Sequence, residues 1–148
     1  MGRREVFDGA VVTRPAPSAR HQGAVANLLM ALRQHCPRTL AVLPGPLDFQ
    51  PSAARSFQPD VIVTRRIHLG AASPLTMPPL LLAEVIDEAS EIWDRSVKPA
   101  LYAASRVDHY WHFDPAVPEF VAYRLAGEEY VEVVTARLEH ELDALKKR

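Results

Sequence analysis

The chain has 148 residues, of which 48% are hydrophobic and 24% charged, with a formal net charge of -1. This composition is ordinary for a globular protein, and the length predicts a single domain, residues 1–148, with a core of its own. No apolar run approaches the ~18 residues that span a membrane, and no apolar signal core follows the first residues, so we expect a cytoplasmic protein without a membrane partner. The single cysteine, Cys36, excludes an internal disulfide framework and a sulfur-rich zinc site.

The first half of the chain predicts a hairpin, a helix and a set of strands. Residues 4–13 form two short apolar runs around Asp8-Gly9, a dipeptide that favours a tight turn with positive φ. Ser18 is a suitable N-cap for the helix that follows. That helix has Val25, Leu28, Leu29 and Leu32 at helical spacing, and His21 extends the same buried stripe. Further strands are expected at 39–43, 46–50 and 60–64.

The second half predicts one buried strand, one helix and a last group of strands. Residues 80–86 are almost entirely apolar, which is typical of a strand buried on both faces of a sheet. A helix is expected at 90–106, and strands at 109–113, 120–125 and 130–134. Residues 137–148 have leucines at helical spacing, but the start of that segment is not evident from the sequence. The order of elements predicts a mixed α/β fold, with a central mixed β-sheet flanked by helices and an N-terminal β-hairpin.

Two carboxylates stand at the edges of the apolar strands. Asp60 begins one strand, and Glu84 stands within the run of residues 80–86. A carboxylate in such apolar surroundings is costly to bury without a cation, a base or a proton. Two strand-end acids suit magnesium, which takes one or two protein carboxylates and keeps places for water and phosphate. A nearby lysine, Lys98, completes a set of residues that is typical of metal-dependent phosphodiester hydrolysis.

At these residues the chain resembles the Uma-type restriction-endonuclease family, a branch of the PD-(D/E)XK nuclease superfamily. The resemblance runs from about residue 5 to residue 130, and it depends on the order and spacing of short segments rather than on any one of them. The matching segments are Phe7-Asp8-Gly9, Pro17-Ser18-Ala19-Arg20-His21-Gln22, Pro59-Asp60-Val61, Glu84-Val85, the helical trio Asp94, Lys98 and Tyr102, Tyr110-Trp111, Asp114-Pro115, and Val121-Ala122-Tyr123-Arg124.

The resemblance implies a restriction-endonuclease-like fold and a set of site residues. It implies that Asp60, Glu84 and the backbone carbonyl of Val85 bind Mg²⁺ or Mn²⁺. Lys98 matches a lysine that the family carries on the helix after the second acid, and His21 matches a histidine that lines the site. The implied catalytic residues are therefore Asp60, Glu84, Lys98 and His21.

The sequence departs from the family at two points. Asp87-Glu88-Ala89-Ser90 replaces a Ser-Pro-Ser-Thr-like stretch, and its acids either cap the second helix or approach the metal and the substrate. Pro99 follows Lys98 directly, and proline disfavours helical geometry in the preceding residue, so it kinks the helix there or begins it. Either change would move the lysine away from the site.

Three of the four site residues also have a structural interpretation without chemistry. Asp60 is then only the first residue of a strand, and His21 is a hydrogen-bonded histidine at the edge of the core. Lys98 then pairs with Asp94 at the surface, one helical turn away. Tyr102, together with Tyr110 and Trp111, is expected to pack in the core or on a sheet face.

Three functional hypotheses follow. The first is a metal-dependent endonuclease that cuts nucleic acid, with DNA as the expected substrate. The second is a nuclease-fold protein that binds nucleic acid without cutting it, which the net charge, Pro99 and Asp87-Glu88 favour. The third is a hydrolase of a small phosphorylated compound. A homodimer is expected if both strands of a duplex are cut, because a two-fold complex presents two sites to antiparallel strands.

Overall fold

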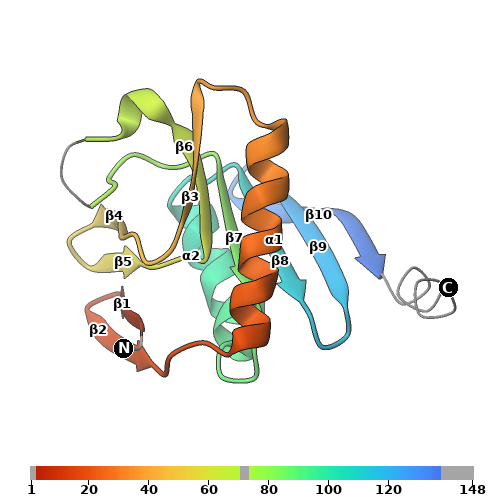
Figure 1. Ribbon diagram of the computed structural model, residues 1–148. Coiled ribbons are helices and arrows are strands. Elements are labelled where there is room, and N and C mark those ends of the chain that lie inside the picture. The colour runs from red at the N-terminus through yellow and green to blue at the C-terminus, as the bar shows by residue number, and fades with distance from the viewer. Residues whose placement is uncertain (1–2, 71–73, 138–148) are drawn as a thin grey trace, which may run out of the picture.

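A computed structural model describes residues 3–70 and 74–137 (Figure 1). Their elements in chain order are β1 (Arg3–Phe7), β2 (Ala10–Arg14), α1 (Ala19–His35), β3 (Leu40–Pro44), β4 (Phe49–Ser52), β5 (Arg55–Phe57), β6 (Val61–Arg65), η1 (Arg66–His68), β7 (Leu81–Val85), η2 (Trp93–Val97), α2 (Lys98–Ala104), β8 (His109–Asp114), β9 (Glu119–Ala126) and β10 (Glu129–Arg137). The predicted mixed α/β fold is confirmed. Within the described residues, no helix is both long and apolar enough to cross a membrane.

The larger sheet has six strands in the order β10-β9-β8-β7-β6-β3. The β7–β8 pair is parallel and the other neighbours are antiparallel, so the sheet is mixed, as predicted. All five residues of β7 are buried, which confirms the prediction of a strand covered on both faces. Because β7 lies inside the sheet, its polar residue Glu84 is held in a fully packed environment.

Helices cover the two faces of this sheet (Figure 1). On one face α1 packs Val25 and its leucines against Val61, Val63 and Ala83. The other face carries the larger apolar cluster, in which Tyr102 of α2 contacts side chains of β6, β7 and β8. Helix α1 begins after Ser18, whose hydroxyl accepts a hydrogen bond from the backbone amide of His21. This confirms Ser18 as the predicted N-cap.

The smaller sheet has four strands in the order β2-β1-β5-β4. Its hairpin turns through Asp8 and Gly9, both with positive φ (49° and 86°), which confirms the predicted tight turn. Strand β5 was not predicted, because it is three residues long and is fixed by pairing with β1 rather than by its own pattern. The strand predicted at 46–50 lies later, at Phe49–Ser52.

The second predicted helix has two parts. Its first part, η2, is π-helical: the Lys98 amide donates to the carbonyl of Trp93, five residues earlier, and α2 continues directly from Lys98. Pro99 supplies no N–H to the preceding turn, and the Tyr110 hydroxyl instead donates to the Asp94 carbonyl (2.5 Å). Lys98 keeps helical dihedral angles (φ -61°, ψ -40°). A wider turn therefore takes the place of the predicted kink, and α2 begins at Lys98 with Pro99 in its first turn, which is the other predicted alternative.

The last hairpin is longer than predicted, because β10 extends to Arg137 and pairs with β9 along its whole length. The leucines of the predicted C-terminal segment lie outside the described residues.

Candidate active site

Asp60 and Glu84 lie at the same end of two neighbouring strands. Strands β6 and β7 are antiparallel with Val61 opposite Ala83, so the next pair in this register brings Asp60 opposite Glu84. Both side chains are buried, at 2% and 0% exposure. The structure therefore places the two predicted acids side by side within the packed interior, as the sequence hypothesis requires.

Glu84 is held by two donors from the second helix. Its Oε1 accepts a hydrogen bond from Lys98 Nζ (3.0 Å) and another from the Tyr102 hydroxyl (2.8 Å). The predicted packing role of Tyr102 is confirmed, because its ring lies in the apolar cluster, but its hydroxyl also belongs to the site. Tyr102 and Lys98 are one helical turn apart, so a single helix face presents both donors to one oxygen.

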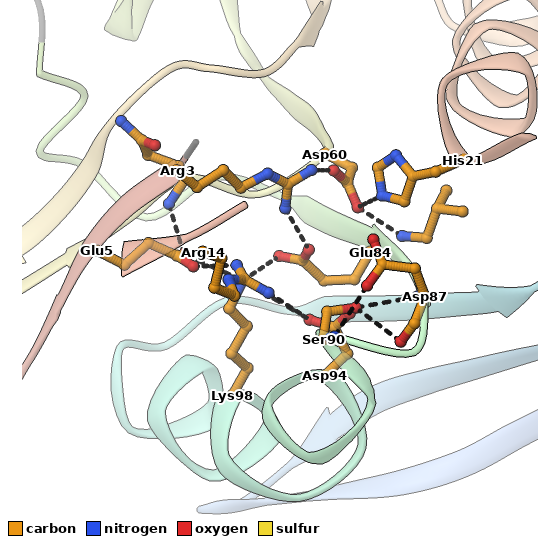
Figure 2. Close-up of polar contacts among 12 residues, drawn as sticks. Arg3, Glu5, Arg14, His21, Asp60, Glu84, Asp87, Ser90, Asp94 and Lys98 are labelled. Atoms are coloured by element: carbon orange, nitrogen blue, oxygen red, sulfur yellow. Dashed lines mark hydrogen bonds and ion pairs between the residues drawn. The ribbon is translucent and has the colours of Figure 1, made fainter. Parts of the chain in front are cut away.

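Lys98 is fully buried among three carboxylates (Figure 2). Its Nζ lies 3.0 Å from Glu84, 3.0 Å from Glu5 Oε2 and 3.7 Å from Asp94 Oδ1. The surface interpretation of the Lys98–Asp94 pair is wrong, because both side chains have 0% exposure. The continuous helix through Pro99 keeps the lysine against Glu84, where the family resemblance puts it.

Asp60 is fixed through one of its oxygens. Oδ2 accepts the backbone amide of Val85 (2.7 Å) and lies 3.2 Å from Nε2 of His21. A carboxylate can only accept, so this contact requires the imidazole proton on Nε2. His21 comes from α1 and has 2% exposure, so the helix covering the opposite face of the sheet contributes to the same site.

Arg3 lies between the two acids, as Figure 2 shows. Its guanidinium forms an ion pair with Asp60 Oδ1, and NH1 lies 3.6 Å from Glu84 Oε2. These two carboxylate oxygens accept no hydrogen bond of normal geometry within the described residues. Arg3 therefore occupies the position to which both free oxygens point.

The sequence hypothesis did not include the charged residues of the N-terminal hairpin. Glu5 on β1 is fully buried, and its carboxylate pairs with Arg14 on β2 as well as with Lys98. Its Oε2 also accepts a hydrogen bond from the backbone amide of Gln58 (2.8 Å), which connects the hairpin to the segment just before Asp60. The alternation of buried and exposed residues along the strand could have indicated that Glu5 is buried, because Glu5 lies on the same strand face as Phe7.

The surrounding cations keep Glu84 ionised. Burial alone raises the pKa of a carboxyl, but the charge of Lys98, followed by those of Arg3 and Arg14, lowers the pKa of Glu84 below its usual value. Burial and the neighbouring Glu84 raise the pKa of Tyr102 well above its usual value, so its hydroxyl keeps the proton that it donates.

Two other groups are held closer to their neutral forms. Burial and the charge of Glu84 raise the pKa of Asp94 to about 7. Burial and the charge of Arg3 lower the pKa of His21, so its imidazole is neutral at pH 7. A neutral imidazole agrees with its role as a donor to Asp60.

The donor set suits a hard divalent cation. Asp60 Oδ1 and Glu84 Oε2 are buried oxygens without normal hydrogen bonds, and oxygen donors are those that Mg²⁺ and Mn²⁺ prefer. No group of three or more His, Cys, Asp and Glu side chains arranged for a metal occurs in the part of the chain that the structure describes. A cation here would therefore depend on two carboxylates and on backbone or water oxygens.

A cavity of about 210 Å³ opens beside Asp60. It is lined by residues that include Arg3, Gln22, Gly45, Gln58 and Asp60. Its walls combine amide and guanidinium groups with prolines, and Asp60 is the acid of the pair that lines it.

Asp87 takes the capping role. Its Oδ1 accepts the Ser90 amide (2.9 Å) and its own amide donates to the Ser90 hydroxyl (3.0 Å), which is the reciprocal pattern of a capping box. Asp87, one of the acids by which the sequence departs from the family pattern, therefore forms hydrogen bonds within the turn that leads into the second helix.

The fold and the paired acids define a nuclease-like α/β protein. The structure is similar to the crystal structure of a putative nuclease belonging to DUF820 from Anabaena variabilis ATCC 29413, with a TM-score of 0.64, 15% sequence identity, and coverage of 87% of this chain and 75% of that chain. At this identity the likeness shows the restriction-endonuclease-like fold. A comparison with curated proteins finds no match.

The family model Uma2, described as "Putative restriction endonuclease", matches residues 2–146. The chain belongs to this family, and the resemblance drawn from the sequence motifs is confirmed.

Proposed function

We propose that the protein is a metal-dependent endonuclease that hydrolyses phosphodiester bonds of nucleic acid, with DNA as the substrate. The observation that carries this proposal is the opposed pair Asp60 and Glu84, with Lys98 Nζ 3.0 Å from Glu84. Two acids and a lysine are the groups that position a cation and an attacking water beside a phosphate. The membership of the chain in the family described as "Putative restriction endonuclease" supports the same reaction class.

The residues that would hold Mg²⁺ or Mn²⁺ are Asp60, Glu84 and, through its backbone carbonyl, Val85. When bound, the cation supplies Lewis-acid polarisation of the phosphate and lowers the pKa of a coordinated water. The charges of the buried acidic and basic side chains around Lys98 support a divalent cation as the occupant. Four buried carboxylates lie beside three basic side chains, and one negative charge is uncompensated when all of them are charged. The acids are Glu5, Asp60, Glu84 and Asp94, and the basic residues are Arg3, Arg14 and Lys98. A divalent cation in the place of the Arg3 guanidinium would balance that charge.

The protein's own groups orient and hold the reactants. Lys98 donates one N–H to Glu84 and forms an ion pair with Glu5, and the N–H that these two contacts leave free would orient the attacking water and offset charge on the phosphate. Tyr102 keeps Glu84 in one orientation, and His21 does the same for Asp60. Attack on phosphorus releases the 3′ oxygen, so the expected product carries a 5′-phosphate.

Substrate would reach the acids from the cavity beside Asp60. Arg3 retains 17% exposure of its side chain, whereas Glu84 and Lys98 have none, so Arg3 is the cover between solvent and the acids. A cation and a phosphate at this site therefore require the Arg3 side chain to move. Once displaced, its guanidinium is suited to bind a phosphate oxygen.

A homodimer is part of this proposal, because cutting both strands of a duplex requires two sites related by a two-fold axis. Molar mass from light scattering, with and without a DNA duplex, tests it. A monomer under both conditions would remove this part of the proposal without affecting single-strand cleavage.

The function is tested by incubating the wild type and Glu84→Gln with supercoiled plasmid and with single-stranded DNA, in manganese, magnesium or EDTA. Cleavage by the wild type should disappear in EDTA and fall at least about 100-fold in Glu84→Gln. Glu88→Gln is the matched control, because Glu88 is an exposed acid four residues away and should cut at the wild-type rate. Equal cleavage by Glu84→Gln and the wild type would contradict the proposed site.

A second candidate function is a nucleic-acid-binding protein that does not cut. The position of Arg3 between the acids and the complete burial of Lys98 favour it, because both keep the site closed. In this case the protein would shift labelled DNA in gels with metal present and leave the strand intact. A folded protein that neither binds nor cuts nucleic acid would contradict both functions.

A further inference from the structure

We infer that Glu5 of the N-terminal hairpin is a positioning residue that holds the Lys98 ammonium in the orientation used in the reaction. This inference rests on the proposed function and assigns to it a residue outside the large sheet. The hairpin then belongs to the active centre instead of being an addition to the fold.

The contact between the two residues is short and completely buried. Glu5 Oε2 lies 3.0 Å from Lys98 Nζ, the same distance that separates Nζ from Glu84 Oε1, and both Glu5 and Lys98 have 0% exposure. The ammonium group of a lysine stands at the end of a long flexible carbon chain, so contact with one carboxylate alone leaves the ammonium group free to move. A second carboxylate at the same distance, from a different sheet, restricts where the ammonium group can lie.

Glu5 is itself fixed by two other partners. Its Oε1 pairs with the Arg14 guanidinium from the neighbouring strand, and its Oε2 accepts the Gln58 amide at 2.8 Å. Gln58 is two residues before Asp60 in the chain. The carboxylate of Glu5 therefore joins the lysine to the segment that carries the first acid.

The helix cannot hold the lysine by itself. Asp94, one turn earlier, lies 3.7 Å from Nζ, beyond hydrogen-bond distance, and neither of its carboxylate oxygens has a hydrogen-bond partner within the described residues. The Tyr102 hydroxyl donates its hydrogen bond to Glu84. Glu5 is therefore the second direct anchor of the ammonium group, and it comes from a different sheet.

A kinetic double-mutant cycle tests this inference. Glu5→Gln keeps the shape and removes the charge, and it should lower kcat 10- to 100-fold while KM for DNA changes less than about 2-fold, because the lysine is misplaced and substrate binding is untouched. In a Lys98→Met background the same substitution should change kcat less than about 2-fold. Equal losses of kcat in both backgrounds would overturn the inference, since Glu5 would then act without Lys98.

Two further variants separate positioning from folding. Glu5→Asp keeps the charge and should recover part of the lost kcat, whereas a purely structural role would make the shortened side chain as harmful as Glu5→Gln. Asp8→Asn is the matched control, because Asp8 is an exposed acid of the same hairpin that pairs only with Arg55 within the described residues. It should cut at the wild-type rate.

A measurement without turnover keeps the inference testable if the protein does not cut DNA. The chain has three lysines, so reductive methylation followed by mass spectrometry reports on Lys98 with Lys146 and Lys147 as internal references. Lys98 should be methylated at least 5-fold faster in Glu5→Gln than in the wild type and in Asp8→Asn, with all three proteins folded by circular dichroism. An unchanged rate would overturn the anchoring role of Glu5. Absence of cleavage by the wild type would instead overturn the proposed function.

Discussion

The amide of Val85 donates a 2.7 Å hydrogen bond to Asp60 Oδ2. This bond fixes the carboxylate at the start of β6 to the backbone of β7, one residue after Glu84. It leaves Asp60 Oδ1 directed at Arg3, as Glu84 Oε2 is. The two acids are therefore prearranged by the sheet, and under the proposed function the arginine is the part of the site that a cation would have to displace.

Arg3→Ala should tighten Mn²⁺ binding by about 10-fold, equivalent to about 1.4 kcal/mol, because the guanidinium no longer competes for the same two oxygens. Calorimetric titration of the apoprotein measures this change. Arg4→Ala is the control, since Arg4 is exposed and its side chain has no ion pair in the described part of the chain. Weaker binding by Arg3→Ala would mean that Arg3 supports the cation instead of competing with it.

Gly45→Ala should disturb the site through the backbone. A Cβ at residue 45 would lie 2.7 Å from the carbonyl oxygen of Pro59, and the Gly45 amide donates to the Asp60 carbonyl (2.9 Å). The strand carrying Asp60 must shift, so we expect a loss of about 1–3 kcal/mol in the free energy of unfolding and weaker Mn²⁺ binding.

Gly23→Ala provides the comparison, because it is exposed in α1 and nothing lies within 4 Å of its added Cβ. This substitution should raise the free energy of unfolding by about 0.5–1 kcal/mol. Urea unfolding of both variants measures the difference, and an unchanged stability of Gly45→Ala would show that the close approach relaxes without cost.

Tyr102→Phe removes the hydroxyl that donates to an ionised, buried carboxylate. We expect it to lower the free energy of unfolding by about 1.5–3 kcal/mol, the usual range for a hydrogen bond to a charged group. Tyr130→Phe should cost only about 0.5–1.5 kcal/mol, because its hydroxyl donates to the neutral carbonyl of Val107 at the same distance, 2.8 Å. Urea unfolding in EDTA compares them, and a smaller loss for Tyr102→Phe would argue that Glu84 is not ionised.

The sequence predicted the site residues that lie on the large sheet and the helix after it. Asp60 and Glu84 were visible because each interrupts or borders an apolar run, and a buried carboxylate needs a partner. The structure brings Lys98 and His21 to the same place, as the family motifs imply. The chemical roles of these four residues stay predictions.

The hairpin residues of the site were harder to predict. Glu5 and Arg14 are far from Lys98 in the sequence, and only the packing of the small sheet on the helix brings them together. Arg3 has no local pattern that separates it from Arg4. Its position between two acids depends on the register of β1 with β2 and on contacts that no short motif records.

Pro99 lies in the first turn of α2, which was one of the two predicted alternatives, but the expected displacement of Lys98 was wrong for a physical reason. The rule that proline breaks a helix assumes that the lost hydrogen bond stays unsatisfied. Here the turn widens, and the Tyr110 hydroxyl, from a strand 11 residues further along, satisfies the Asp94 carbonyl. Sequence spacing alone does not show such a donor.

The pH dependence of stability should carry the signature of Asp94. Its pKa is raised from 3.8 to about 7 in the folded protein, so between these values the folded state binds a proton that the unfolded state has lost. The contribution of Asp94 to the free energy of unfolding should therefore fall as pH rises from about 4 to about 7, and then stay level.

Urea unfolding in EDTA, for the wild type and Asp94→Asn at a series of pH values, isolates this contribution. The stability of the wild type relative to Asp94→Asn should decrease across this window. A difference that rises with pH would mean that the carboxylate, and not the acid, is the form stabilised by folding.

The most direct test of the metal site is calorimetric titration of Mn²⁺ into the apo wild type, Asp60→Asn and Glu84→Gln at pH 7.5. One bound ion per chain is expected for the wild type, with binding lost or weakened at least about 10-fold in each variant, although both variants remain folded. The same affinity in all three proteins would contradict the assignment of Asp60 and Glu84 as metal ligands, and the endonuclease mechanism with it.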